Sequence, residues 1–156
     1  MSFVLGLNHK LYYLSTGTRA AWPATGDPDD LVEITNARDL TFSGDSATAD
    51  VSTRGGGKFR QQVATLNDAE VEFEMIYDTA DAAFTFLRAA WLAGTVFGLA
   101  ILDGASDVDG TEGIWMDAMV TAFGWDQELE EAGKIPITLS NTRTAVPLEA
   151  VTVVVP

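Results

Sequence analysis

Ala69-Glu-Val-Glu-Phe-Glu-Met-Ile-Tyr77 is the stretch that decides the fold. Apolar and acidic side chains alternate along it, and this period of two is typical of a β-strand with one face on a core and the other on solvent. The apolar face consists of Val71, Phe73, Met75 and Tyr77, and the acidic face of Glu70, Glu72 and Glu74. A sheet with one buried face is therefore the expected framework.

Working outward, similar patterns predict further strands near residues 11–14, 31–43, 47–51, 95–102, 114–125, 135–140 and 148–155. Gly44-Asp45 is a candidate hairpin turn, and Asn36-Ala37-Arg38 a candidate bulge. One helix is expected over about 79–93, with Asp78 or Thr79 as its cap and Gly94 just after its end. This order predicts a single domain over residues 1–156, mainly β (α+β): an antiparallel β-sandwich or barrel with one flanking helix.

Composition and net charge exclude several classes of function. The chain has 156 residues, a net charge of −14 and no cysteine, which excludes thiolate chemistry and argues against DNA binding through phosphate neutralisation. The first residues lack the basic start of a signal peptide. No apolar run approaches the roughly 20 residues of a membrane span. A soluble protein made in a cytoplasm is expected, with no cofactor.

The candidate catalytic motifs fail on their spacing. His9 is the only histidine and has no acidic neighbour in the sequence, so a Ser–His–Asp triad has no support. The run Gly55-Gly56-Gly57-Lys58 resembles a phosphate loop, but Ser52 stands where that motif needs its first glycine. We therefore expect no enzyme and no catalytic residue.

The acidic residues suggest other sites. Asp103, Asp107, Asp109 and Glu112 could form a calcium site outside the EF-hand frame, although a solvated turn is the simpler interpretation. The three glutamates of the central strand share one face and cannot flank a sugar as glycosidase carboxylates do. They form a row of negative charges on one face of the strand. No metal site is assigned.

Four tryptophans are many for a domain of this size: Trp22, Trp91, Trp115 and Trp125. Core packing accounts for Trp91 and Trp115, and contact between subunits is the alternative, because tryptophan is enriched at interface cores.

From about residue 31 to 148 the chain resembles the major tail tube proteins of bacteriophages with long, non-contractile tails and their prophage-derived relatives. The segments that carry the resemblance are Glu33–Asp39, Ala49–Gly55, Ala64–Met75, Asp78–Asp81, Gly94–Phe97, Leu102–Gly104, Val120–Phe123 and Glu128–Ala132. Two features depart from the family pattern, namely Gly124-Trp125 and the apolar segment Leu148–Pro156.

The resemblance implies a structural virion protein without catalysis. Six copies would form a ring, and rings would stack into a tube around a lumen through which DNA passes without specific binding. Partners would be further copies and tail assembly proteins such as the tape measure, terminator and distal tail proteins, with assembly in the cytoplasm of a bacterial host. Six copies would carry a charge of −84, so that an acidic lumen would conduct DNA and not hold it.

Two sets of residues receive roles on this basis. Glu70, Glu72 and Glu74 are assigned to the lumen, with outer solvent as the alternative. Arg54, Gly55, Gly56, Gly57, Lys58 and Arg60 are assigned to contact between rings, within a long loop over about 43–67 that becomes ordered on stacking. Two other functions stay open: a tube subunit of a contractile tail or secretion-type injection device, and a small acidic calcium- or carbohydrate-binding module.

Overall fold

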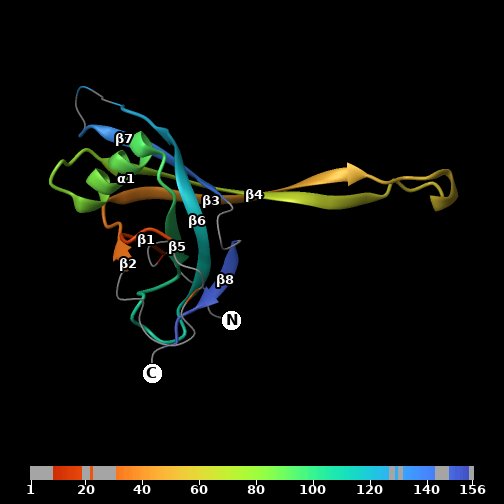
Figure 1. Ribbon diagram of the computed structural model, residues 1–156, viewed down its shortest axis with the longest axis horizontal. Coiled ribbons are helices and arrows are strands. Elements are labelled where there is room, and N and C mark those ends of the chain that lie inside the picture. Colours follow the sequence, from red (N-terminus) through yellow and green to blue (C-terminus); the bar gives the residue numbers. More distant parts are fainter. Residues whose placement is uncertain are drawn as a thin grey trace.

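A long, curled antiparallel sheet organises the molecule (Figure 1). The computed structural model describes residues 9–18, 22, 31–126, 129, 132–142 and 148–154. The strands run β2-β1-β5-β6-β7-β4-β3, and β8 also pairs with β6. Their bounds are β1 Lys10–Leu14, β2 Leu31–Glu33, β3 Ala37–Asp50, β4 Gln62–Ile76, β5 Phe97–Leu102, β6 Glu112–Phe123, β7 Lys134–Asn141 and β8 Glu149–Thr152.

Strand β6 joins the two halves of the sheet. Its first part pairs with β8 on one edge, its last part pairs with β7 on that same edge, and β5 lies on the other. The sheet thus bends into two packed layers, β3-β4-β7 with the end of β6, and β2-β1-β5 with the start of β6. The predicted mainly β fold with one helix is confirmed.

The main core fills the space between these layers. Val71, Phe73 and Met75 are buried as their alternation predicts, and they meet side chains from β5, β6 and β7. Helix α1, Ala82–Ala93, closes the open side with Ala83, Phe84, Leu87 and Ala90. A second cluster behind β1 and β5 includes Trp115, Tyr12 and Val151. The predicted core position of Trp115 is therefore confirmed.

Helix α1 begins later than expected. Asp81 is its N-cap, and its carboxylate accepts a 2.9 Å hydrogen bond from the N–H of Ala83. The expectation that Asp78 or Thr79 caps the helix is wrong, because Asp78 instead closes the preceding turn by accepting from the N–H of Ala80. Gly94 ends the helix in the left-handed conformation, as predicted.

The predicted turn at Gly44-Asp45 is also wrong. Strand β3 continues through it, with Gly44 opposite Ala69 and Asp45 opposite Asp68. The ladder between β3 and β4 shifts register twice. One shift lies between Arg38 and Thr41, just after the predicted bulge, where Asp39 has a φ of 53°, and the other between Ser46 and Thr48. The expected loop over 43–67 is therefore mostly a two-stranded hairpin.

Most of the chain between the predicted strands at 11–14 and 31–43, and the end of the predicted C-terminal strand at residue 155, lie outside the described residues. Within the part of the chain that the structure describes, no helix is long and apolar enough to cross a membrane.

Candidate functional site: an extended arm, an acidic face and an aromatic patch

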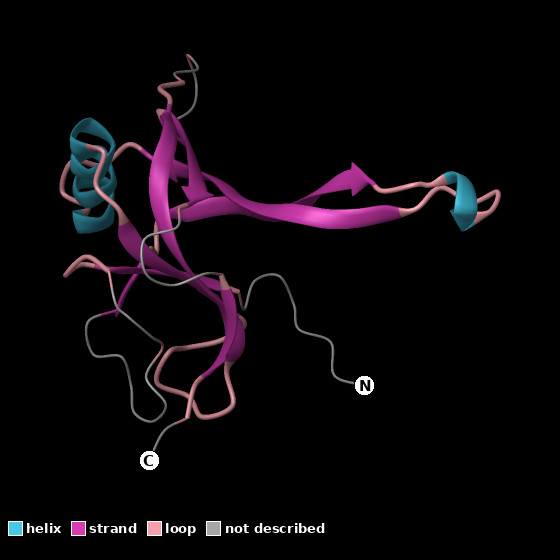
Figure 2. Cartoon of the chain, turned by 45° about the vertical axis from the view of Figure 1, so that its right-hand side comes forward, coloured by secondary structure: helices cyan, strands magenta, loops and turns pink. Residues whose placement is uncertain are grey.

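A hairpin arm projects from the body (Figures 1 and 2). Strand β4 pairs with β7 only from Glu70 onward, whereas its pairing with β3 continues out to Gln62. The segment 44–68 therefore leaves the sheet as two strands with both faces exposed. Beyond Glu70 the described residues of the body provide no strand that supports it. Such an isolated ribbon buries little apolar surface, and a two-stranded hairpin of this kind is at best marginally stable on its own.

The tip of the arm brings the predicted contact residues together. Val51 donates a backbone hydrogen bond to Gln61 at 2.9 Å, and the Ser52 hydroxyl accepts one from the N–H of Gln61 at 2.8 Å, which closes the base of the tip. A single 3-10 turn, Arg54–Gly56, follows, and Gly57 has a φ of 85° that favours glycine. Arg54, Gly55, Gly56, Gly57, Lys58 and Arg60 all lie in this tip.

The tip is basic and carries one large apolar group. Phe59 is 86% exposed between Lys58 and Arg60, and the sequence from Val51 to Gln61 contains three basic residues and no acidic one. Arg60 forms an exposed ion pair of 3.4 Å with Asp50. The Asp50 carboxylate accepts hydrogen bonds from Ser52. The bond from the hydroxyl has the larger effect and the bond from the backbone N–H adds to it, so the pKa of Asp50 lies below its usual value. A cationic surface around an exposed aromatic ring is suited to an acidic, aromatic partner.

The outer face of the β3-β4-β7 layer is acidic. Glu70 and Glu72 are exposed and Glu74 is half-buried, all on the side of β4 opposite the core. Successive carboxylates lie roughly 6.6 Å apart along the strand. Their cross-strand neighbours are mostly hydroxyl side chains: Thr41, Ser43, Thr138 and Ser140. The other two neighbours, Arg38 and Pro136, lie opposite Glu74, so the row of negative charge is flanked by hydroxyl groups except at that end.

Two further carboxylates extend this row onto the arm. Asp68 precedes Glu70 by two positions and so shares its face, and Asp45 lies directly opposite Asp68 on β3. Asp68 could have been predicted from the sequence, because the acidic positions of the 69–77 strand recur every two residues and Asp68 is the next such position toward the N-terminus. Asp45 could be found only from the register, because its neighbour Gly44 suggests a turn.

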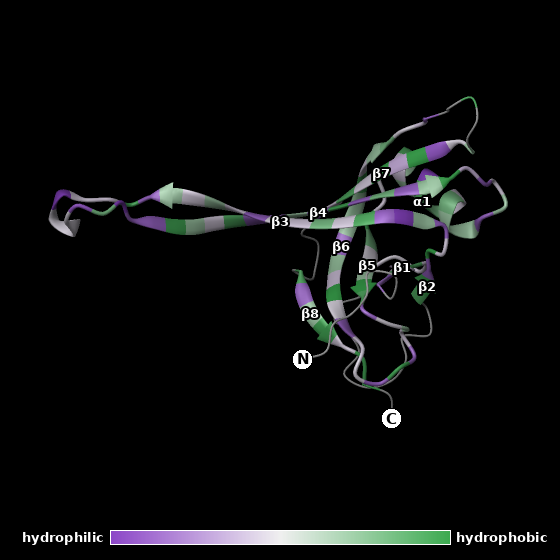
Figure 3. Cartoon of the chain, turned by 180° about the vertical axis from the view of Figure 1, so that it is seen from behind, coloured by the Kyte–Doolittle hydropathy of each residue, from purple (hydrophilic) through white to green (hydrophobic). Residues whose placement is uncertain are grey.

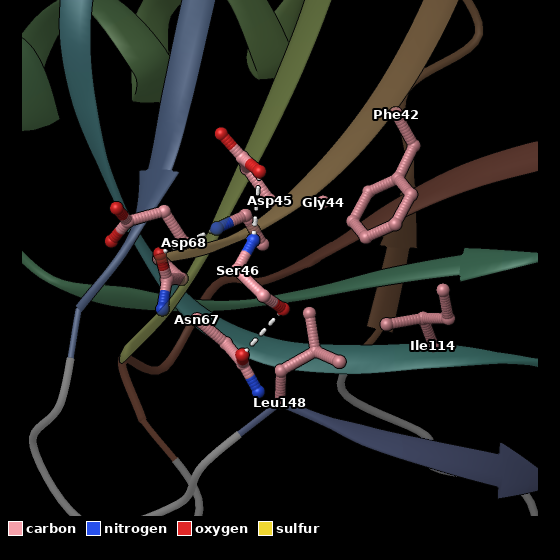
Figure 4. Close-up of a pocket in the computed structure, with 10 residues that line it drawn as sticks. Phe42, Gly44, Asp45, Ser46, Asn67, Asp68, Ile114 and Leu148 are labelled. Atoms are coloured by element: carbon pink, nitrogen blue, oxygen red, sulfur yellow. Dashed lines mark hydrogen bonds between the residues drawn. The ribbon is translucent and has the colours of Figure 1, made fainter. Parts of the chain in front are cut away.

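A hollow of about 350 Å³ lies where the arm leaves the body (Figure 4). Phe42, Ile114 and Leu148 form its apolar side, and the carboxylates of Asp45 and Asp68 point away from them. The polar groups at its floor bind one another: the hydroxyl of Ser46 lies 2.7 Å from Oδ1 of Asn67, and Asn141 accepts from the N–H of Ala69 at 2.9 Å. The hollow therefore lacks the convergent, unsatisfied polar groups of a small-molecule site.

An aromatic patch lies on the body away from the arm. Rings follow one another from Trp91 through Phe123, Phe84 and Tyr77 to Trp125, with centroid distances of 5.4, 6.0, 5.4 and 4.5 Å. Phe84 is buried, whereas Trp91 is 42% and Trp125 61% exposed. The core position expected for Trp91 is thus wrong, because its ring stacks on Phe123 but the side chain stays exposed.

Other predicted chemistry finds no support in the geometry. Among residues 9–18, 22, 31–126, 129, 132–142 and 148–154, no three His, Asp or Glu side chains gather as they would around a metal ion. Asp103 accepts a 2.9 Å hydrogen bond from the N–H of Glu112 and so closes the acidic turn itself. His9 is exposed and lines a hollow with Asp39, Leu40, Phe42 and Ile101, none of which carries the hydroxyl that a Ser–His–Asp triad needs.

No protein-family profile and no curated protein matches the chain. Solved structures do match. The "SPP1 tail tube" is similar at a TM-score of 0.69 and 13% identity, covering 97% of this chain and 80% of that one. A chain of the "virion of native gene transfer agent (GTA) particle" gives 0.66 and 12%, with 95% and 98% covered. A chain of the "anti-feeding prophage (AFP) baseplate" gives 0.62 and 7%, with 97% of each covered. The chain therefore has the fold that these tail structures share.

Proposed function

We propose that this chain is the structural subunit of a phage tail tube, in which six copies form a ring and stacked rings form a conduit for DNA. The observation that carries this proposal is the arm: a long exposed hairpin with a basic, aromatic tip that its own chain leaves uncovered. The shared fold supports the same role. The protein acts by assembly, so it needs no catalytic residue and no cofactor.

Free sheet edges support closure into a ring. Strand β3, 14 residues long, is the last strand of the sheet, and no other strand among the described residues pairs with its outer edge. At the other side of this layer, Met119–Phe123 of β6 extends beyond the last pairing with β5, at Ala118. Two different free edges allow identical subunits to join side by side, and a heterologous contact of this kind closes into a ring when its rotation permits.

The arm supports stacking. It projects well beyond the body, so its tip reaches a surface that ring neighbours leave open. We propose that Arg54, Lys58 and Arg60, carried by the glycines of the tip, contact the next ring. In an isolated subunit the arm is expected to move and to become ordered on stacking.

The acidic face supports the role of a conduit. When β3-β4-β7 layers join edge to edge, one face of the resulting barrel lines the bore. The core-side face is occupied by the body, so Glu70, Glu72 and Glu74 are left to face the lumen. Fixed negative charge prevents phosphates from binding, and the duplex slides past.

We place the protein in the tail of a virion, assembled in the cytoplasm of a bacterial host with tape measure, terminator and distal tail proteins as partners. We favour a long, non-contractile tail. The runner-up, a contractile tail or injection device, uses the same fold, and a sheath gene beside the coding gene would favour it.

Negative-stain electron microscopy of the concentrated protein, with light scattering for its mass, tests the proposal. Hollow filaments or rings with sixfold end views are expected. The double variant Arg54→Glu/Lys58→Glu should keep the fold and shorten the tubes. It gives the tip negative charge, which is repelled by the acidic surface that the tip is proposed to contact. Its control, Arg54→Lys/Lys58→Arg, keeps both charges and should give tubes of normal length.

Two results would contradict the proposal. Equal tube lengths for the charge-reversed and control variants would show that the basic tip of the arm does not contribute to stacking. A chain that stays monomeric at every concentration, and whose melting temperature rises with calcium, would favour the acidic binding module.

A further inference from the structure

The arm and the aromatic patch lie at opposite ends of the molecule. Helix α1 and the start of β7 occupy one end in Figures 1 and 3, and the tip of the arm occupies the other. Trp91 belongs to α1, and Trp125 is held near the start of β7 because Asp126 exchanges two 2.8 Å backbone hydrogen bonds with Lys134. Two distinct surfaces facing opposite ways are what a head-to-tail contact between identical subunits requires.

We propose that this aromatic patch, defined by Tyr77, Trp91 and Trp125, receives the arm tip of a second copy of the chain, with Phe59 packing on Trp125. The inference rests on the proposed function, because it names the surface at which stacked rings would meet. A chain cannot make this contact with its own arm. Strand β4 alone has eight residues from Gln62 to Ala69 outside the β7 pairing, or roughly 26 Å of extended arm leading away from the body.

Charge complementarity favours this pairing. The tip carries Arg54, Lys58 and Arg60 and no acid, whereas the sequence that follows Trp125 up to Gly133 has four acidic residues and no basic one. Asp78 lies next to Tyr77 in the sequence and adds a further carboxylate. Within a protein of net charge −14, the basic tip of one copy is thus opposite in sign to Asp78 and Asp126, which adjoin Tyr77 and Trp125 of another.

The chemistry of the side chains also fits. Trp125 has an open ring face, and indole is the best aromatic partner for a guanidinium or ammonium group. Phe59 supplies an exposed ring that can stack on Trp125 or Tyr77 while its two basic neighbours reach the carboxylates around the patch. Exposed tryptophan and tyrosine side chains backed by a rigid core are typical of the residues that dominate binding energy at interfaces.

Disulfide trapping tests the contact directly, because the chain contains no cysteine of its own. One sample carries Phe59→Cys and a second carries Trp125→Cys, and the two are mixed at high concentration and oxidised. Both positions are exposed, so neither change should disturb the core. A disulfide requires Cα atoms about 4.4–6.8 Å apart. We expect a covalent dimer from the mixture, and a ladder of multimers when both cysteines are in one chain.

Matched pairs locate the contact. Phe59→Cys mixed with Val108→Cys, an exposed apolar position in the acidic turn, should give no dimer. Phe59→Cys with Leu148→Cys tests the hollow at the root of the arm as the competing receiver. A dimer with Leu148→Cys and none with Trp125→Cys would overturn the inference.

The same samples separate this inference from the proposed function. If electron microscopy shows tubes but the cysteines at positions 59 and 125 do not crosslink, the inference is overturned and the proposed tube function stands. The absence of tubes, rings and crosslinks together would overturn both. A Trp125→Ala variant should shorten tubes to the same degree as Phe59→Ala, and combining the two should add little, since both remove one contact.

Discussion

The indole of Trp115 lies over Gly98, and a β-carbon added at position 98 would approach Cζ2 of the ring to 2.6 Å. The two residues sit on neighbouring strands, β6 and β5. The bulk of the tryptophan is thus accommodated by the absence of a side chain at position 98. Trp115 belongs to the second cluster of the core, which also includes Val151 of β8.

Gly98→Ala should therefore destabilise the protein. The Trp115 ring is fully buried and cannot move without disturbing Tyr12 and Val151 around it. Overpacking of this kind costs about 1–3 kcal/mol, which corresponds to a fall of about 2–12 °C in melting temperature for a chain of this length. Thermal unfolding followed by circular dichroism measures it. Gly55→Ala is the control, because a β-carbon there meets no atom within 4 Å, and its melting temperature should stay near that of the wild type.

Asp81→Ala should weaken the start of α1. The carboxylate of Asp81 satisfies the N–H of Ala83, which has no partner inside the helix. Losing an N-cap costs about 0.5–2 kcal/mol, measurable by urea unfolding. Thr79→Ala is the matched control. If Thr79→Ala destabilised the protein as much as Asp81→Ala, the cap would have been assigned to the wrong residue.

Local patterns predicted which segments form strands and, for residues 71–75, which face is buried. The alternation of Val71, Phe73 and Met75 is a property of the segment itself, so it can be recognised without any partner. The pairing of β1 with β5 or of β8 with β6 depends on contacts between residues far apart in the sequence, and no local signal encodes it. At Gly44-Asp45 the local sequence and the long-range pairing conflict. The sequence favours a turn, but the pairing of β3 with β4 continues on both sides of it, so the strand does not turn there.

The candidate site was predictable to a similar extent. The composition of the tip, three glycines among basic residues, marked it as a contact segment. The length of the arm and the exposure of Phe59 emerge only when β3 and β4 are seen to pair beyond the support of β7. The aromatic patch could not be found from the sequence, since Trp91, Phe123 and Tyr77 come from three elements that the fold brings together.

Tyr13 should make the stability of the protein sensitive to alkaline pH. Burial raises the pKa of its phenol above the ordinary value of 10.0, and the nearby Asp81 carboxylate raises it further. Because the folded-state pKa lies above the unfolded one, the neutral phenol contributes stability in full below about pH 10. This contribution is lost as the pH rises through the folded-state pKa.

Urea unfolding between pH 8 and pH 11 would measure this effect. The free energy of unfolding of the wild type should fall at the alkaline end, and that of Tyr13→Phe should fall less, because phenylalanine keeps the stacking on Phe86 without a group that ionises. Parallel curves for the two proteins would show that Tyr13 is not responsible.

Reversing the acidic face should convert a conduit that repels DNA into one that binds it. In the triple variant Glu70→Lys/Glu72→Lys/Glu74→Lys, each chain changes by six charge units, and these side chains lie opposite the core, so folding should persist. If they line the bore, assembled tubes of the variant should retain short duplex DNA. Retention should weaken steeply as salt rises, because each phosphate contact releases counterions. Wild-type tubes should retain none in a sedimentation assay.

The position of the new charge is what decides this last prediction. Asp45→Lys/Asp68→Lys puts two positive charges on the same side of the sheet but out on the arm, beyond the β7 pairing. This variant should retain less DNA per added charge than the triple variant, since the arm would be covered by its neighbour. Equal retention per charge for both variants would mean that DNA binds the outside of the tube. Glu70, Glu72 and Glu74 would then face outer solvent, and the lumen would have to be lined by another surface.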